Sequence, residues 1–115
     1  FAATLAAGTL VELPAITSIA TTLGARKVAA QALAYAQNGN VASALVSDAA
    51  AVEACLRFAD DHRALVEPAC GAALAVVYQR HPALAGVRDV LVIACGGIGV
   101  THAKLAHWQH ILLPE

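Results

Sequence analysis

Apolar residues recur with helical spacing in the first half of the chain. The positions of Val28, Gln31, Ala32 and Tyr35 predict a helix from Val28 to Gln37, which the turn-forming residues 38–40 end. Residues 1–24 lack a clean period and predict short helical turns around a loop at residues 12–15. Residues 41–46 predict a short strand.

Two more helices are predicted after residue 46. Ser47 or Asp48 can cap the first, because a short side-chain oxygen there accepts a hydrogen bond from a free N–H of the first turn. The predicted core stripe of this helix contains Val52, Leu56 and Ala59, and its predicted polar face contains Glu53, Arg57 and Asp60. Pro68 suits the first turn of the next helix, which we expect to run to about Tyr78 and to end at His81-Pro82.

The most pronounced strand pattern is the continuous apolar run from Val90 to Ala94. Such runs are typical of parallel strands that are covered on both faces. A glycine-rich turn at residues 96–99 follows, and then a last helix from Thr101 to about Leu112. Helices that alternate with strands predict an α/β fold with a parallel sheet.

Composition limits the kinds of partner. The 115 residues are 59% hydrophobic and 13% charged, which is enough for one domain or one piece of a domain. A formal net charge of −1 with seven scattered basic residues argues against nucleic acid and an anionic membrane as partners. Polar residues interrupt every apolar stretch before the roughly 18 residues that a membrane span needs. A small uncharged or zwitterionic ligand fits better.

The three cysteines have no spacing typical of a metal site or a disulfide framework. Cys55, Cys70 and Cys95 form an odd set without a CxxC pair, which favours a reducing cytoplasm. Cys55 and Cys70 are interpreted as buried, inert thiols. His107 and His110 share a helix face, but no carboxylate or cysteine joins them at ligand spacing, so a solvated surface is predicted.

Candidate chemistry lies at the end of the predicted strand. Cys95 is followed by Gly96 and Gly97 at the carboxyl end of a strand, where open α/β sheets bind ligands and where glycine leaves backbone N–H groups accessible. Cys95 is therefore either a ligand-facing thiol or a buried small hydrophobe. A dinucleotide fingerprint fits poorly, because His102 stands where Gly or Ala is expected. Glu67 either complements the dipole of the helix at Pro68 or faces a pocket.

Taken in order, several segments resemble the C-terminal part of L-serine dehydratase. They are Leu13 to Ala20, Gly24 with Ala30 to Leu33, Val46 to Asp48, Phe58 to Asp61, Val66 to Tyr78 and Ile93 to Gly97. That family consists of pyridoxal-phosphate enzymes of fold type II, which also includes the tryptophan synthase β-subunit. The resemblance implies that residues 1–115 are the C-terminal portion of a parallel-sheet large domain that binds this cofactor.

The resemblance also implies a reaction and a site. L-Serine loses its α-proton and hydroxyl and ends as pyruvate and ammonia, and L-threonine gives 2-oxobutanoate. Cys95 matches the residue that faces the pyridine nitrogen, and Gly96 and Gly97 would keep the backbone close to the ring. Glu67 would line or support the pocket with the small residues 71–73, and Thr22 occupies the ring-stacking position.

Further implications concern an ion and an assembly. The family binds a monovalent cation such as K⁺ through backbone carbonyls, and Leu23 and Ala25 match two of those positions. Carbonyl ligation does not depend on the side chain, so Ala25 is compatible with it. Members of the family are often dimeric, which makes a homodimer one expectation.

Two features keep other functions open. The family's cofactor-binding lysine lies in an upstream Ser-x-Lys motif, and its phosphate cradle is an upstream run of glycines; Lys27 and Lys104 match neither context. The residues given are therefore not expected to carry the reaction alone. Thr22 and Ile98 depart from the family pattern, which favours a non-catalytic binding or oligomerisation module as one alternative. A small nucleotide-binding α/β protein is another.

Overall fold

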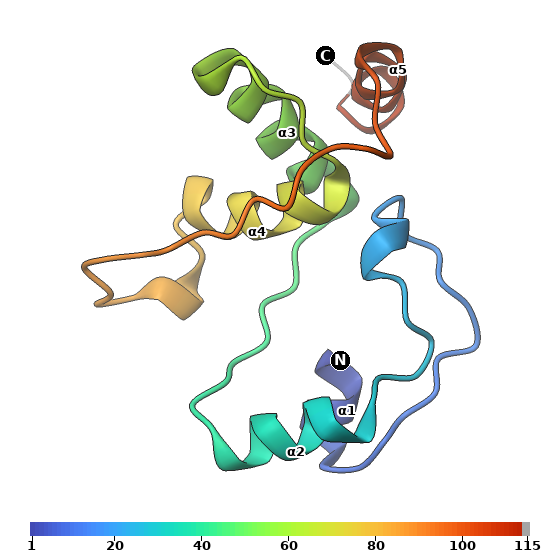
Figure 1. The fold of residues 1–115 in the computed structure, drawn as a ribbon, viewed down its shortest axis with the longest axis vertical. Helices are drawn as coiled ribbons and strands as arrows, with labels where there is room; N and C mark the ends of the chain where they lie inside the picture. Colours follow the sequence, from blue (N-terminus) through green and yellow to red (C-terminus); the bar gives the residue numbers. More distant parts are fainter. Residues whose placement is uncertain (114–115) are drawn as a thin grey trace. The chain divides into compact units, whose positions relative to one another are not determined.

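The computed structural model describes residues 1–113, which fall into two compact units (Figure 1). The first unit is Phe1–Leu45 and the second begins at Val46. Helices joined by long irregular segments make up each unit. Within residues 1–113, no helix is long and apolar enough to cross a membrane.

The first unit pairs the helices α1 (Ala2–Ala7) and α2 (Ala30–Asn38). The predicted helix from Val28 to Gln37 is confirmed, with its start displaced by two residues. The buried residues of α2 are Leu33 and Ala36, whereas Tyr35, one of the residues whose spacing predicted the helix, is 69% exposed. Leu33 and Ala36 lie three residues apart on one helix face, and α2 is in contact with α1.

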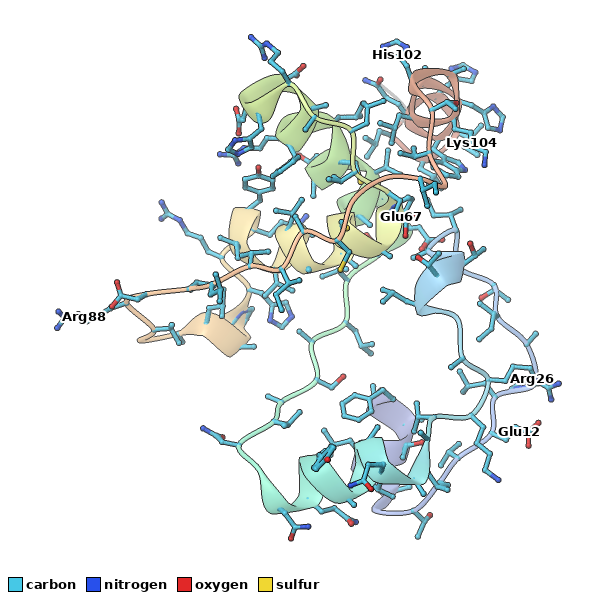
Figure 2. All side chains as sticks on the ribbon, in the orientation of Figure 1. Glu12, Arg26, Glu67, Arg88, His102 and Lys104 are labelled. Atoms are coloured by element: carbon cyan, nitrogen blue, oxygen red, sulfur yellow. The ribbon has the colours of Figure 1, made fainter. Side chains whose placement is uncertain are left out.

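A polar clamp joins the two loops that connect these helices. The backbone N–H of Leu13 donates to the carbonyl of Arg26 at 2.8 Å, and the Nε of Arg26 donates back to the carbonyl of Leu13 at 2.9 Å. The guanidinium of Arg26 also pairs with Glu12 at 2.9 Å, and Figure 2 shows the two side chains meeting. The clamp fixes residues 12–13 beside the segment that follows the 3-10 helix η1 (Thr21–Leu23).

The second unit contains three helices. α3 (Asp48–His62) packs against both α4 (Pro68–Tyr78) and α5 (His102–Leu112), and the 3-10 helix η2 (Pro82–Leu84) follows α4. All three helices confirm the sequence prediction, including Pro68 in the first turn of α4. Ser47 is the cap of α3, because its Oγ accepts a hydrogen bond from the N–H of Ala50 at 3.1 Å.

Of the predicted apolar stripe of α3, Val52 is buried, whereas Leu56 and Ala59 are half-buried. The other buried residues of this helix are Ala50, Ala51, Ala54 and Cys55. Glu53, Arg57 and Asp60 are exposed as predicted. A single cluster forms the core of the second unit. It contains Ala50, Ala54, Cys55, Val66, Cys70, Leu74, Ala75, Val100 and Leu105. This cluster joins α3 and α4 to α5 and to the segment that leads into it.

The helices α3 and α4 approach each other closely at Gly71 of α4. A Cβ atom added there would collide with the carbonyl oxygen of Ala51 and would lie 2.6 Å from the Sγ of Cys55, both on α3. Real Cβ atoms essentially never approach other atoms so closely. Because Gly71 has no side chain, the backbone of α3 can pack directly against α4 at this residue.

The two predicted strands are not present in the residues that the structure describes. Residues 41–46 and 90–94 run without helix, and neither pairs with a strand within residues 1–113. A strand is defined by hydrogen bonds to a neighbouring strand, and the apolar run alone cannot supply that neighbour. In the second segment Val92 packs on the core, whereas Leu91 is 92% exposed and Ile93 71% exposed.

Candidate functional site

The turn at residues 95–99 lies against the first turn of α4. The backbone N–H of Glu67 donates a hydrogen bond to the carbonyl of Gly96 at 3.1 Å. The extended segment before this turn runs along α4, as Figure 1 shows, and Val90 and Val77 line one cavity of about 320 Å³ at the other end of that helix. The two motifs singled out in the sequence, at residues 66–74 and 90–97, are therefore neighbours in space.

Cys70 forms the most specific link between the helix and the turn. Its Sγ accepts a hydrogen bond from the backbone N–H of Cys95 at 3.1 Å and donates one to the carbonyl of Gly96 at 3.3 Å. Cys70 is buried, with 3% of its surface exposed. The prediction of burial is confirmed, but the thiol is not inert, because it holds the peptide groups on either side of the Cys95-Gly96 pair.

Two charged side chains contact the far end of the turn. An Oε2 atom of Glu67 accepts a hydrogen bond from the N–H of Gly99 at 3.3 Å. The Nζ of Lys104 on α5 donates to the carbonyl of Gly99 at 3.1 Å, and both side chains are labelled in Figure 2. Glu67 stands at the start of α4 without a side-chain cap bond, so its carboxylate supports the turn from a position near the positive end of the helix.

The two adjacent glycines of the turn differ in their surroundings. Gly96 has a φ of +124°, and no atom lies within 4 Å of the place where its Cβ would be. A Cβ on Gly97 would instead lie 2.5 Å from the carbonyl oxygen of Leu65 and 3.0 Å from Val100. Gly97 therefore faces its own chain, and Gly96 faces open space.

The side chain of Cys95 is exposed beside Gly96. Of the two interpretations of Cys95, burial as a small hydrophobe is wrong, because the extended segment ends at the surface of the second unit. The exposed thiol and the open backbone of Gly96 form a small accessible surface. Hydrogen bonds to Cys70 and Glu67 hold this surface in place.

The remaining candidate residues lie in the first unit. Thr22 and Leu23 belong to η1, and Leu23 is 62% exposed. The carbonyl of Leu23 accepts a hydrogen bond from the N–H of Ala25 at 3.0 Å across Gly24, whose φ of −78° and ψ of 84° are close to an inverse γ-turn. Leu23 and Ala25 thus share one tight turn. A carbonyl oxygen has a second lone pair, so this hydrogen bond leaves room for ligation.

No group of three or more metal-ligating side chains occurs within the described part of the chain. His102, His107 and His110 are exposed on α5, as expected for a solvated face.

Burial raises the pKa of the Cys55 thiol from 9.0 to about 11, and proximity to Cys70 adds to the rise. The folded protein therefore keeps this proton between pH 9 and 11, while the unfolded chain loses it. We expect this group to stabilise the fold fully below pH 9 and to lose that contribution, on the order of 2 kcal/mol, as the pH rises toward 11. The difference in unfolding free energy between the wild type and Cys55→Ala, measured by denaturant titration at pH 8 and pH 11, should shrink by that amount. An unchanged difference would contradict the assignment.

Comparison with known proteins decides where these motifs belong. The sequence model of a family described as pyridoxal-phosphate dependent enzyme matches residues 1–96. The chain belongs to this family. The matched region includes every residue predicted from the resemblance, from Thr22 to Gly96, except Gly97, which follows it directly.

Individual relatives within the pyridoxal-phosphate family are closely similar. A serine dehydratase-like protein of Rattus norvegicus is 50% identical over 113 residues, covering 91% of this chain and 34% of the relative. The L-serine dehydratase/L-threonine deaminase of Homo sapiens is 45% identical, with the same coverage. The crystal structure of a fungal L-serine ammonia-lyase from Rhizomucor miehei matches with a TM-score of 0.91 at 33% identity, over 96% of this chain and 37% of that one. The chain spans about a third of the length of these relatives.

Sequence reasoning missed Cys70 as a member of this site. A sequence signal existed, because Cys70 lies in the first turn after Glu67-Pro68 and a pair of glycines allows close approach of another segment. This signal does not reveal that residues 67–70 and 95–96 are adjacent, because that depends on the tertiary fold.

Proposed function

We propose that this chain is part of a dehydratase that depends on pyridoxal phosphate and converts L-serine to pyruvate and ammonia, and L-threonine to 2-oxobutanoate. The exposed thiol of Cys95 beside the open backbone of Gly96 carries the proposal. The names of the relatives support the substrate class, since they are serine dehydratases or a serine ammonia-lyase.

The residues of the turn fit a flat aromatic cofactor. A ring needs one side of the backbone to be free of side chains, and Gly96 meets this condition because nothing lies within 4 Å of its missing Cβ. The adjacent thiol of Cys95 is exposed and can meet the ring nitrogen. The hydrogen bonds from Cys70 and Glu67 keep this surface fixed from the side of α4.

In the proposed mechanism the residues of this chain tune the cofactor and do not anchor it. Pyridoxal phosphate supplies an electron sink for the α-carbon of the amino acid. Cys95 contributes a thiol at the pyridine nitrogen, and a thiol, unlike a carboxylate, does not hold a proton on that nitrogen. This arrangement favours loss of the β-hydroxyl over transamination. The anchoring lysine and the phosphate-binding glycines are assigned to residues outside these 115.

The proposal includes the fold of the whole domain. Residues 90–94 become an inner strand of a parallel sheet of fold type II, and residues 1–115 form the C-terminal portion of that large domain. The exposure of Leu91 and Ile93 on a segment whose Val92 packs on the core supports this assignment, because a strand between two helical layers needs apolar residues on both faces. The similarity to the fungal ammonia-lyase supports it further.

The other predicted residues have supporting roles in this proposal. Thr22 stacks on the cofactor ring, and the carbonyls of Leu23 and Ala25 bind a monovalent cation such as K⁺, which their position in one tight turn supports. Gly97 keeps the turn compact. A homodimer in the cytoplasm completes the proposal, and three free cysteines suit a reducing compartment.

The complete enzyme that contains this chain provides the test. Purified with pyridoxal phosphate and mixed with L-serine, it should show the cofactor's absorption band and release pyruvate, which lactate dehydrogenase and NADH detect. A protein with the absorption band but no turnover of L-serine or L-threonine would overturn the substrate assignment. A protein with neither would favour the non-catalytic binding module.

A further inference from the structure

We propose that Cys70 is a positioning residue that sets the direction in which Cys95 presents its sulfur. This inference rests on the proposed function, because Cys70 acts through Cys95 and does not itself meet the cofactor. It assigns a role in the reaction to a buried thiol that sequence analysis interpreted as inert.

The hydrogen bonds of Cys70 go to backbone atoms on both sides of Cys95. Its Sγ receives the N–H of Cys95 at 3.1 Å and donates to the carbonyl of Gly96 at 3.3 Å. A thiol is a weak donor and a weak acceptor, so this one side chain can make both bonds at once. Fixing the N–H on one side of Cys95 and the carbonyl of the next residue limits rotation of the backbone between them. The direction of the Cα–Cβ bond of Cys95 is limited with it.

The base on which Cys70 stands is rigid. The residue lies in the first turn of α4, next to Gly71, where the backbone of α3 comes close to that of α4. Its exposed fraction is 3%, so the thiol has little freedom to change rotamer. Cys70 therefore fixes the turn at residues 95–99 relative to the packed helices α3 and α4.

Loss of the Cys70 thiol would affect the N–H of Cys95 and the carbonyl of Gly96 unequally. The carbonyl of Gly96 also accepts the N–H of Glu67 at 3.1 Å, so it keeps a donor when Cys70 is truncated. The N–H of Cys95 would lose its bond to Cys70. We therefore expect truncation to loosen the Cys95 end of the turn while the Gly96 end stays attached to α4.

Cys55 offers a matched control. It is a second buried cysteine in the same core cluster, with no exposed surface, and its Sγ lies beside Gly71. Truncating Cys55 removes the same atoms from the same core and leaves the hydrogen bonds to Cys95 and Gly96 in place.

The experiment uses the complete holoenzyme and two readouts, the visible circular dichroism of the bound cofactor and the rate of pyruvate release. We expect Cys70→Ala to weaken the dichroism and to lower kcat about tenfold, as a small displacement of a reacting group does. Cys70→Ser should recover part of both, since a hydroxyl donates and accepts but lies on a shorter bond. Cys55→Ala should leave both readouts at the wild-type level.

A double variant separates positioning from stability. If Cys70 acts through Cys95, Cys70→Ala combined with Cys95→Ala should be no worse than Cys95→Ala alone. Additive losses, or equal losses for Cys70→Ala and Cys55→Ala, would overturn the inference while leaving the proposed function intact. A Cys95→Ala enzyme that keeps wild-type dichroism and rate would instead remove Cys95 from the cofactor ring, and both proposals about these two thiols would fail together.

Discussion

Replacing Gly71 with alanine is expected to destabilise the protein by about 3 kcal/mol. The added methyl group would meet the carbonyl of Ala51 and the sulfur of Cys55, and the carbonyl belongs to a helical backbone that cannot move aside alone. α3 and α4 would have to separate, which would disturb the core they share. Denaturant unfolding of the purified variant measures the effect.

The sign of this effect is informative. Intrinsic helix propensity favours alanine over glycine by about 1 kcal/mol, so Gly71→Ala would stabilise the protein if propensity decided the outcome. Ala73→Gly, at an exposed position of the same helix, provides the control and should destabilise by about that amount. A Gly71→Ala protein as stable as the wild type would show that the two helices are not in contact at this residue.

Replacing Cys95 with aspartate is expected to lower pyruvate release from L-serine at least about tenfold, which corresponds to about 1.4 kcal/mol in the barrier. A carboxylate at the ring nitrogen would hold a proton there, which draws electron density into the ring and away from the bond to the β-hydroxyl. Steady-state kinetics with L-serine, together with an assay for the aminated cofactor produced by transamination, measures both consequences.

Cys95→Ser is the matched control for this change. A hydroxyl, like a thiol, places no charge at the ring nitrogen, so this variant should retain most of the wild-type rate. Equal losses of pyruvate release in Cys95→Ser and Cys95→Asp would show that packing at this position, and not charge at the ring nitrogen, causes the loss. A Cys95→Asp enzyme with the wild-type rate would contradict the placement of this residue at the nitrogen.

Local signals explain what could be predicted from the sequence. Pro68 marked the start of α4, and Ser47 marked the start of α3, because capping depends on neighbours within one turn. The two predicted strands are not seen within residues 1–113 for the opposite reason. Hydrogen bonds between strands join residues far apart in the sequence, and an apolar run such as residues 90–94 does not reveal its partner.

The candidate site shows the same division. Cys95 and Gly96 could be singled out because a thiol before a glycine pair is visible in the sequence. Cys70 could not, since its role depends on the hydrogen bonds that join α4 to the turn across a large separation in sequence. The burial of Leu33 and Ala36 on α2 likewise depends on the tertiary fold and could not be assigned from helical spacing alone.

Because Cys70 forms hydrogen bonds to main-chain atoms, substitutions of residue 95 have a particular consequence. The N–H and carbonyl that it holds are present whatever side chain residue 95 carries, so an exchange there leaves the support of the turn intact. The side chain at position 95 can thus change the type of reaction while the backbone that carries it stays in place. Residue 95 could therefore be exchanged without loss of this support, provided that position 70 keeps a small side chain that can donate and accept a hydrogen bond.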